Sequence, residues 1–406
     1  MGIPSRQMAV VLPWGESAAI CPGGQSNRKT ISGKWRFGRE NSRGANMTVV
    51  GWDIGGANLK QSTSDGRAWS TPFELWRHPD RLADHLRNML AQVEASPEAV
   101  AVTMTGELAD CFATKAEGVA AILKAAQEAA AGYTLAVWST DGTFLDAAAA
   151  RAMPHKVAAA NWHALATWTA RWVNAVETAS GPTCGLLIDI GSTTTDIIPL
   201  IDGRPAARGL TDPERLQSGE LLYTGVRRTP LAAILSNVAW RGCSTPVAAE
   251  WFATTYDVYL LLGDLPEDEQ DRCTANGRPA TKAAAHDRVA RMLCADRGDI
   301  PFHEALLLAR QWARGQERLI ASCVRRVVNR LPGRCQALIL SGSGEFLARR
   351  VIREVSELDG VESISLTQRL GAAVAASSAA AAVASLLAEQ LGAAGTVASW
   401  RRMPTG

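Results

Sequence analysis

Two motifs of the same kind place a carboxylate just ahead of glycines. Asp53 precedes Gly55-Gly56, and Asp189 precedes Gly191-Ser192-Thr193, in each case at the end of an apolar run. A carboxylate supplies a hard oxygen ligand and glycines leave backbone N–H groups uncovered, which suits Mg²⁺ beside a phosphate. For one copy alone, an ordinary β-hairpin explains the glycines equally well. Two copies, together with a later glycine-rich loop at Gly342-Ser343-Gly344, favour a phosphate site.

The elements that carry these motifs are short apolar runs alternating with longer helical ones from Met47 onward, which predicts an α/β protein. The first half is expected to contain strands at 48–53, 59–64, 100–104 and 135–138, and helices at about 80–95 and 115–130. The second is expected to contain a helical run at 155–178, strands at 186–189, 196–201 and 336–340, a tight turn at Asp202-Gly203, and helices at 303–331 and from Glu345. The stretch from about Asp212 to Gly298 looks irregular and charged.

The two D-I-G motifs form an internal repeat, with Asp53 and Asp189 about 136 positions apart. Two homologous α/β halves facing each other follow from this repeat. We expect residues 1–46 to be a disordered extension or a start assigned too early, with Met47 as the true initiator. Residues 47–155 would form the first half. Residues 156–406 would form the second, with an inserted segment at about 212–300 and a C-terminal helix.

Composition limits the classes of function. The 406 residues suit two domains, and the 47% hydrophobic content can fill their cores. A net charge of +2 gives no chain-wide basic field, so a nucleic acid is not an expected partner. The uncharged 370–388 stretch is built of Ala, Ser and Val, which favours a packed helix over a membrane span. The N-terminus lacks a secretory pattern, so we expect a cytoplasmic protein.

The two hairpins and the late loop resemble the superfamily of sugar kinases, chaperone ATPases and actin over residues 47–391. This resemblance implies two actin-like (ribonuclease H-like) domains facing across a cleft. The first phosphate motif would then take Asp53, Gly55 and Gly56. The second would take Asp189, Gly191, Ser192, Thr193 and Asp196, and the loop that meets the nucleoside would take Gly342, Ser343 and Gly344. One position departs from the pattern, because Ala57 stands where the kinases place Thr or Ser.

Longer motifs resemble a narrower group. D-I-G-G-A-N-L-K, M-T-G-E-L-A-D-C-F, A-A-N-W, I-D-I-G-S-T-T-T-D-I-I-P-L and T-D-P-E-R-L together are similar to the hydantoinase/oxoprolinase-like branch. Within it they look most like proteins of the tetrahydromethanopterin-linked one-carbon pathway. An archaeal relative of those proteins is a methanofuran-biosynthesis synthase, which joins an aminomethyl-furanmethanol diphosphate to γ-glutamyltyramine and releases diphosphate.

That resemblance implies a transferase with Mg²⁺ as cofactor and with small-molecule diphosphate and phenolic amine substrates. Asp53, Asp189 and Asp196 are the candidate metal ligands, and Lys60 and Lys115 the candidate cationic contacts to diphosphate, although either lysine also suits a solvated surface. Glu107 or Asp110, just after a predicted strand, could receive the phenol proton; a carboxylate there could equally cap the helix that begins near Lys115.

Other interpretations stay open at this point. An ATP-dependent kinase or a hydrolase of hydantoinase/oxoprolinase type would use the same cleft, and a non-catalytic nucleotide sensor would keep only the fold. The pair Arg227-Arg228 could meet an acidic substrate tail or simply be solvated. The sequence also leaves a homodimer open and predicts no membrane partner.

Overall fold

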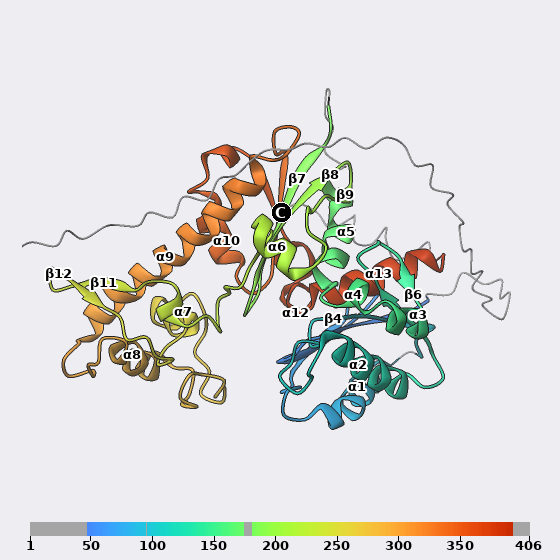
Figure 1. The fold of residues 1–406 in the computed structure, drawn as a ribbon, viewed down its shortest axis with the longest axis horizontal. Coiled ribbons are helices and arrows are strands. Elements are labelled where there is room, and N and C mark those ends of the chain that lie inside the picture. Colours follow the sequence, from blue (N-terminus) through green and yellow to red (C-terminus); the bar gives the residue numbers. More distant parts are fainter. Residues whose placement is uncertain (1–46, 95, 174–180, 393–406) are drawn as a thin grey trace, which may run out of the picture. The chain divides into compact units, whose positions relative to one another are not determined.

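The computed structural model describes residues 47–94, 96–173 and 181–392. The extension expected at residues 1–46 lies outside this part. Two six-stranded sheets dominate the described chain, and both appear in Figure 1.

The first sheet has the strand order β3-β2-β1-β4-β5-β6. Its central strand, β1, pairs antiparallel with β2 and parallel with β4. All six residues of β1 are buried, as the apolar run TVVGWD predicted. The strands are β1 (Val49–Ile54), β2 (Asn58–Thr63), β3 (Ala68–Pro72), β4 (Ala99–Met104), β5 (Thr134–Trp138) and β6 (Phe144–Leu145).

The second sheet repeats this plan in the order β10-β8-β7-β13-β14, with β9 paired to β8. Its central strand, β7, pairs antiparallel with β8 and parallel with β13. The strands are β7 (Cys184–Ile190), β8 (Thr195–Ile201), β9 (Arg204–Pro205), β10 (Leu221–Leu222), β13 (Ala337–Ser341) and β14 (Glu362–Ser365). The repeated plan confirms the expected fold of two actin-like α/β halves.

The turn between β8 and β9 has the geometry that the sequence predicted. Asp202 and Gly203 both have positive φ, 49° and 74°. Two consecutive left-handed residues are the requirement of a type I′ hairpin turn, and the Asp-Gly pair satisfies it.

Two helices, α5 (Asn161–Val173) and α13 (Ser378–Gln390), join the halves. Helix α13 packs against β1, β2 and β4 of the first sheet and against α5, which in turn packs against β7 and β8 (Figure 1). The C-terminal helix, expected in the second half, therefore covers the sheet of the first. Alanines on α13 allow this close approach, and a Cβ at Gly51 would lie 2.0 Å from Ala380 O.

The segment expected to be irregular, 212–298, contains several regular elements joined by loops. It contains helices α6 (Asp212–Ser218), α7 (Thr255–Leu262) and α8 (Lys282–Arg291), and a two-stranded hairpin of β11 (Asn237–Trp240) and β12 (Cys243–Pro246). Helices α6 and α7 each begin with a capping box, Thr211 with Glu214 and Thr254 with Asp257. Both start signals are local patterns in the sequence, a Thr followed three residues later by a carboxylate.

Several of the remaining helices have different bounds from those that the sequence predicted. The described part of the run expected at 155–178 divides into α4 (Pro154–Val157) and α5, because Ala159 between them has a left-handed φ of 47°. Residues 174–178 of that run lie outside the described residues. The expected helix at 80–95 is α1 (Leu82–Leu90), after a 3-10 turn, η1 (Pro79–Arg81). The others are α2 (Lys115–Ala129), α3 (Ala147–Ala152), η2 (Leu231–Ala233), α9 (Phe302–Val328), α10 (Glu345–Ile352), η3 (Ser356–Leu358), α11 (Leu366–Leu370) and α12 (Ala372–Ala376).

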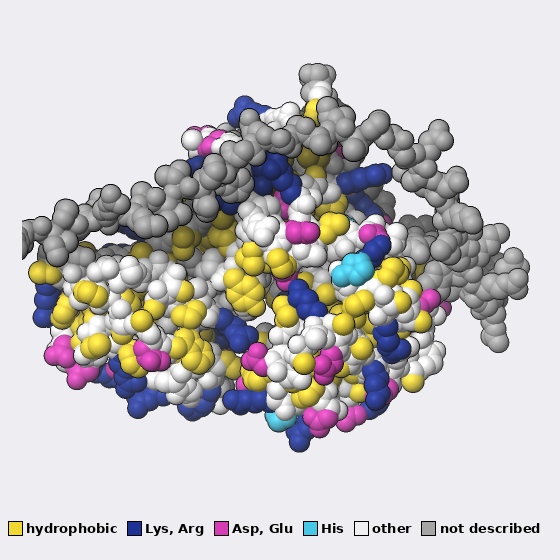
Figure 2. Space-filling view, in the orientation of Figure 1, with side chains coloured by type: hydrophobic (Ala, Val, Ile, Leu, Met, Phe, Trp, Pro, Cys, Tyr) yellow, Lys and Arg dark blue, Asp and Glu magenta, His cyan; other side chains and the backbone are white. Residues whose placement is uncertain are grey.

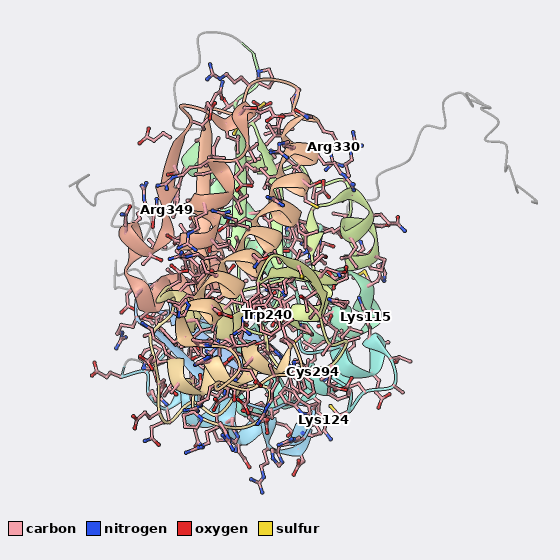
Figure 3. The ribbon with its side chains drawn as sticks, turned by 90° about the vertical axis from the view of Figure 1, so that its left-hand side faces the viewer. Lys115, Lys124, Trp240, Cys294, Arg330 and Arg349 are labelled. Atoms are coloured by element: carbon pink, nitrogen blue, oxygen red, sulfur yellow. The ribbon has the colours of Figure 1, made fainter. Side chains whose placement is uncertain are left out.

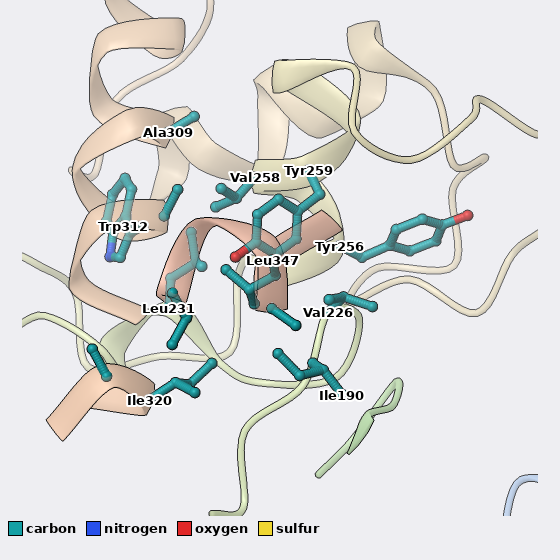
Figure 4. Close-up of a cluster of buried hydrophobic side chains, with 14 of the residues drawn as sticks. Ile190, Val226, Leu231, Tyr256, Val258, Tyr259, Ala309, Trp312, Ile320 and Leu347 are labelled. Carbon is teal, nitrogen blue, oxygen red and sulfur yellow. The ribbon is translucent and has the colours of Figure 1, made fainter. Parts of the chain in front are cut away.

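A large apolar core supports the second sheet. Ile190, which directly follows Asp189, and Val226 are fully buried in it together with Tyr259, Trp312 and Leu347 (Figure 4). The hairpin after β7 and the segment around residue 226 therefore rest on one rigid core.

The surface carries no dominant charge on the face drawn in Figure 2, where basic and acidic side chains are interspersed. Among the described residues, no helix combines the length and apolarity that crossing a bilayer requires.

Candidate active site

Asp53 is the next-to-last residue of the central strand of the first sheet and lies beside Lys60 of β2. The two are register partners, and Lys60 Nζ donates to Asp53 Oδ2 over 3.3 Å. Asp53 is 3% exposed, and its other oxygen, Oδ1, is buried without a hydrogen-bond partner in the described part of the chain. A buried polar atom without a partner costs free energy unless a ligand supplies one. Asp53 therefore presents one free oxygen to a ligand.

The turn after Asp53 contains two glycines with different constraints. Gly55 N–H donates to Asn58 O over 3.1 Å, and a Cβ at Gly55 would lie 2.9 Å from that oxygen. A Cβ at Gly56 would meet no atom within 4 Å. Gly55 is thus needed to close the turn, whereas the space beside Gly56 is open to a ligand.

Asp189 holds the equivalent position in the second sheet, and its Oδ1 is likewise buried without a partner among the described residues. Burial, followed by the Asp196 carboxylate, raises the pKa of Asp189 to about 7; Asp53 adds to the rise, while Lys60 and Ser341 oppose it. Because Asp53 and Lys60 belong to the first hairpin, their electrostatic effect on Asp189 indicates that the two hairpins lie near each other.

The second turn presents hydroxyl groups. Gly191 N–H donates to Thr194 O over 2.9 Å and closes the turn, and Ser192 Oγ and Thr193 Oγ1 lie 3.3 Å apart on half-buried residues. Hydroxyls and turn amides at such a site can donate to phosphate oxygens.

The glycine loop after β13 packs directly onto this turn. Gly342 has a φ of 85°, and a Cβ there would lie 2.3 Å from Ile190 O and 2.6 Å from Asp189 Oδ1. Gly344 N–H donates to Ile190 O over 2.8 Å, and Ser343 between them is exposed. The structure therefore brings the predicted late loop to the second hairpin, and a nucleoside role for the loop stays a prediction.

Asp196, the third candidate metal ligand, is the register partner of Asp189 on β8. Arg215 Nη1 donates to Asp196 Oδ1 over 2.7 Å, so this oxygen already has a cationic partner. Burial raises the pKa of Asp196, and Arg215 lowers it. Asp196 as a metal ligand stays a prediction that this ion pair does not favour.

Sequence reasoning gave no role to Arg215, which connects several parts of the site. Its guanidinium also donates to Asp212 Oδ1 over 3.2 Å and lies over the ring of Trp162 at 4.3 Å. The motifs T-D-P-E-R-L and A-A-N-W contain all three residues. The capping box at Thr211 was the local signal that placed Asp212 and Arg215 on the first turn of a helix.

Glu107 follows β4 and is buried at 1% exposure, with Oε2 lacking a partner in the described part of the chain. Burial raises the pKa of Glu107 to about 7, Lys115 lowers it, and Asp212 raises it. At neutral pH this carboxylate is thus divided between its protonated and ionised forms, as a proton acceptor requires. The effect of Asp212 indicates that α6 lies near Glu107.

Asp110 and Lys115 occupy different environments. Asp110 is exposed, whereas Glu107 is buried, and a role of either carboxylate in the site stays a prediction. Lys115 begins α2 (Figure 3) and acts electrostatically on Glu107. The cap of α2 is Thr114, whose side chain accepts from Glu117 N–H over 3.1 Å, so neither Glu107 nor Asp110 caps this helix.

A metal ion would need ligands from outside the protein. Across residues 47–94, 96–173 and 181–392, no group of three or more His, Cys, Asp or Glu side chains is arranged to hold one. Mg²⁺ commonly binds through one or two carboxylates, waters and substrate phosphates. The free oxygens of Asp53 and Asp189 fit that mode of binding.

Comparison with known proteins assigns this architecture to a family. The model of the hydantoinase/oxoprolinase family matches residues 98–389. A synthase from Methanocaldococcus jannaschii is 32% identical over 348 residues, which cover 85% of this chain and 99% of the relative. A synthase of the same name from Methanococcus vannielii is 33% identical over 208 residues, which cover 51% of this chain and 92% of the relative.

Both relatives are named for their product, a (furan-2-yl)methanamine that carries a phenoxymethyl group with a (γ-L-glutamylamino)ethyl substituent.

Among solved structures, a nucleotide-free acetone carboxylase aligns with a TM-score of 0.47 at 10% identity, covering 84% of this chain and 70% of that one. A similarity at this level supports no inference about activity.

Proposed function

The chain belongs to the hydantoinase/oxoprolinase family and is an enzyme of the synthase class, and from this premise we propose that it is a Mg²⁺-dependent transferase that joins a furfuryl-type diphosphate to a tyramine-type phenol. The product named for both relatives contains the aryl–O–CH₂–furan ether that this reaction would form. The observation that carries the proposal is the pair of carboxylates at the ends of the two central strands, Asp53 and Asp189, each with one buried oxygen that has no partner among the described residues.

The proposed reaction exchanges one C–O bond for another. The bond between the furfuryl CH₂ and the diphosphate oxygen breaks, and its electron pair leaves with diphosphate. The phenol oxygen forms the new bond to the same carbon and releases its proton. The furan ring can delocalise the positive charge that develops on the carbon, so the main demand on the enzyme is to stabilise the leaving diphosphate.

The two hairpins provide groups for that task. Lys60 supplies a positive charge, Ser192 and Thr193 supply hydroxyl donors, and the space beside Gly56 is open to a phosphate. Mg²⁺ held by the free oxygens of Asp53 and Asp189 would supply further positive charge to the diphosphate.

Glu107 is the proposed acceptor of the phenol proton. It is buried, its Oε2 has no hydrogen-bond partner among the described residues, and its pKa is raised to about 7. A proton acceptor works best with a pKa near the operating pH, because enough of it is ionised while it still binds protons well.

The reaction would serve the biosynthesis of a one-carbon carrier of the methanofuran or tetrahydromethanopterin-linked type.

The test is to incubate the enzyme with a synthetic aminomethyl-furfuryl diphosphate, γ-glutamyltyramine and Mg²⁺, and to measure diphosphate and the ether by mass spectrometry. We expect the two products in equal amounts, and neither after chelation of the metal. Parallel reactions would replace the furfuryl diphosphate with ATP. ATP turnover coupled to phosphorylation of a small molecule, without ether formation, would favour the kinase interpretation instead.

A further inference from the structure

The segment Thr224–Thr229 is attached to the second phosphate hairpin by backbone hydrogen bonds. Val226 N–H donates to Gly191 O, and Arg227 and Arg228 N–H both donate to Ser192 O, each over 3.0 Å. A Cβ at Gly225 would lie 2.5 Å from Gly191 O. This segment therefore cannot move independently of the hairpin, and the arginine side chains start from a fixed position beside it.

The buried side of the same segment forms hydrogen bonds with two neighbouring helices. Gln316 Nε2 donates to Thr224 Oγ1 over 2.8 Å and to Gly225 O over 2.9 Å, and Thr255 Oγ1 donates to Gly225 O over 2.8 Å. These bonds come from α9 and α7. The segment is thus a rigid support for the two arginines.

Arg227 and Arg228 differ in their exposure and in their ion-pair partners. Arg227 forms an ion pair with Asp271 and lies 4.0 Å over the ring of Tyr256, whose hydroxyl also donates to Asp271 over 3.1 Å. Its charge is therefore compensated within the second half. Arg228 is exposed, and within the described residues no carboxylate lies within 4 Å of its guanidinium.

Arg228 instead reaches the first half of the chain. Its guanidinium lies 5.6 Å from the ring of Trp76. Trp76 follows Leu75, whose N–H donates to Gly56 O over 3.0 Å, so this tryptophan is tied to the first hairpin. Glu74 and Arg228 both act electrostatically on Cys273, which places residues of both halves around the same point. Arg228 thus extends from the second hairpin toward a residue tied to the first, with an aromatic neighbour and, among the described residues, no ion-pair partner.

We propose that Arg228, supported by Trp76, binds the carboxylate of the amino-acid end of the phenolic acceptor and so selects glutamylated acceptors over unmodified ones. This inference rests on the proposed function. A planar guanidinium pairs with a carboxylate through two parallel N–H···O bonds, and an aromatic ring beside it limits its rotamers. Arg228 therefore provides a cation next to the hairpins but separate from Lys60, where the acceptor's charged end can bind without competing for the diphosphate groups.

The experiment compares binding of γ-glutamyltyramine and tyramine by calorimetry, so that it does not depend on turnover. The variants are Arg228→Ala and Arg228→Lys, with Arg310→Ala as a matched control, because Arg310 is exposed on α9. The wild type is expected to bind the glutamylated acceptor about 10 to 100 times more tightly than tyramine, as one charged hydrogen-bonding pair allows. Arg228→Ala should lose that preference, Arg228→Lys should keep part of it, and Arg310→Ala should keep all of it.

The outcomes separate this inference from the proposed function. If Arg228→Ala weakens both acceptors equally, weakens only the diphosphate substrate, or keeps the preference, Arg228 does not select the carboxylate. The same holds if the wild type shows no preference. If the preference exists and requires Arg228 but no ether forms from the furfuryl diphosphate, the acceptor site stands and the proposed reaction is wrong.

Discussion

Asp196 and Arg215 form a buried ion pair, with Arg215 Nη1 2.7 Å from Asp196 Oδ1 and both side chains less than 10% exposed. The pair fixes β8, the returning strand of the second hairpin, to helix α6. The stacking of Arg215 on Trp162 extends this connection to α5. Asp196 therefore acts as an anchor for the hairpin that carries Asp189.

Replacement of Arg215 by Met should strongly destabilise the fold. Asp196 and Asp212 would both lose their cation, and removing one member of a buried pair typically costs about 3–5 kcal/mol of unfolding free energy. Asp196→Asn should cost less, because Arg215 keeps its bond to Asp212. Urea unfolding of each variant and of the double variant measures both values and their coupling.

The control is Arg87→Ala. Arg87 pairs with Asp84 on the exposed surface of α1, where an ion pair contributes at most about 1 kcal/mol. Equal stability losses for Arg87→Ala and Arg215→Met would show that the buried ion pair contributes no more to the free energy of unfolding than the exposed one.

Asp53→Asn and Asp189→Asn should each abolish turnover while the fold survives. Each change keeps the side-chain volume and removes a negative charge that the proposed diphosphate site requires, from a carboxylate with one unpartnered oxygen in the described part of the chain. We expect a loss of at least about 100-fold in kcat, typical for a group that stabilises developing charge. Turnover and thermal melting are measured on the same preparations.

Asp80→Asn is the matched control, because Asp80 is an exposed aspartate in the first half, on η1. It should keep the wild-type rate. Normal turnover in both Asp53→Asn and Asp189→Asn would exclude the two-hairpin site.

The local part of the site could be predicted from the sequence. Asp53 with Gly55-Gly56 and Asp189 with Gly191 are short patterns at the ends of apolar strands, and each hairpin is made of neighbouring residues. Strand burial follows directly from the apolar runs. The loop at Gly342 was also predictable, because a strand, a glycine run and a helix follow one another.

The non-local part could not be predicted in this way. Arg215 is 19 positions from Asp196, and its burial depends on how α6 packs, which no local pattern encodes. The position of α13 on β1 depends on contacts more than 300 positions apart in the chain. The difference between Arg227 and Arg228 likewise depends on Asp271, which lies far along the chain in a loop.

The raised pKa of Glu107 predicts a pH dependence of turnover. As the proposed proton acceptor it must be ionised, so kcat should rise with pH through about 7, the raised pKa of this group. Glu107→Gln should lower kcat at every pH and remove this rise. A pH–rate profile from pH 5 to 9 with saturating substrates gives the result. An unchanged profile in Glu107→Gln would assign the proton to another group.

The same carboxyl should affect stability in the ligand-free enzyme. Its folded-state pKa lies above its ordinary value of 4.5, so the folded state binds the proton more tightly than the unfolded state. The resulting stability is fully present below pH 4.5 and is lost as the pH rises through about 7. Above that pH, Glu107→Gln should be more stable than the wild type by on the order of 3 kcal/mol. A variant that is less stable than the wild type at pH 8 would contradict this assignment.

Gly56→Ala and Gly51→Ala should separate a ligand effect from a packing effect. A Cβ at Gly56 meets no protein atom within 4 Å, so this variant should melt like the wild type. If a phosphate lies beside Gly56, the added methyl group occupies that space and raises KM for the diphosphate substrate. A Cβ at Gly51 would lie 2.0 Å from the backbone oxygen of Ala380, so Gly51→Ala should push α13 off the first sheet and lower the melting temperature by several degrees. Because the clash is with backbone, Ala380→Gly should not restore stability. A Gly56→Ala enzyme with wild-type KM and kcat would mean that no substrate group approaches the first hairpin at this point.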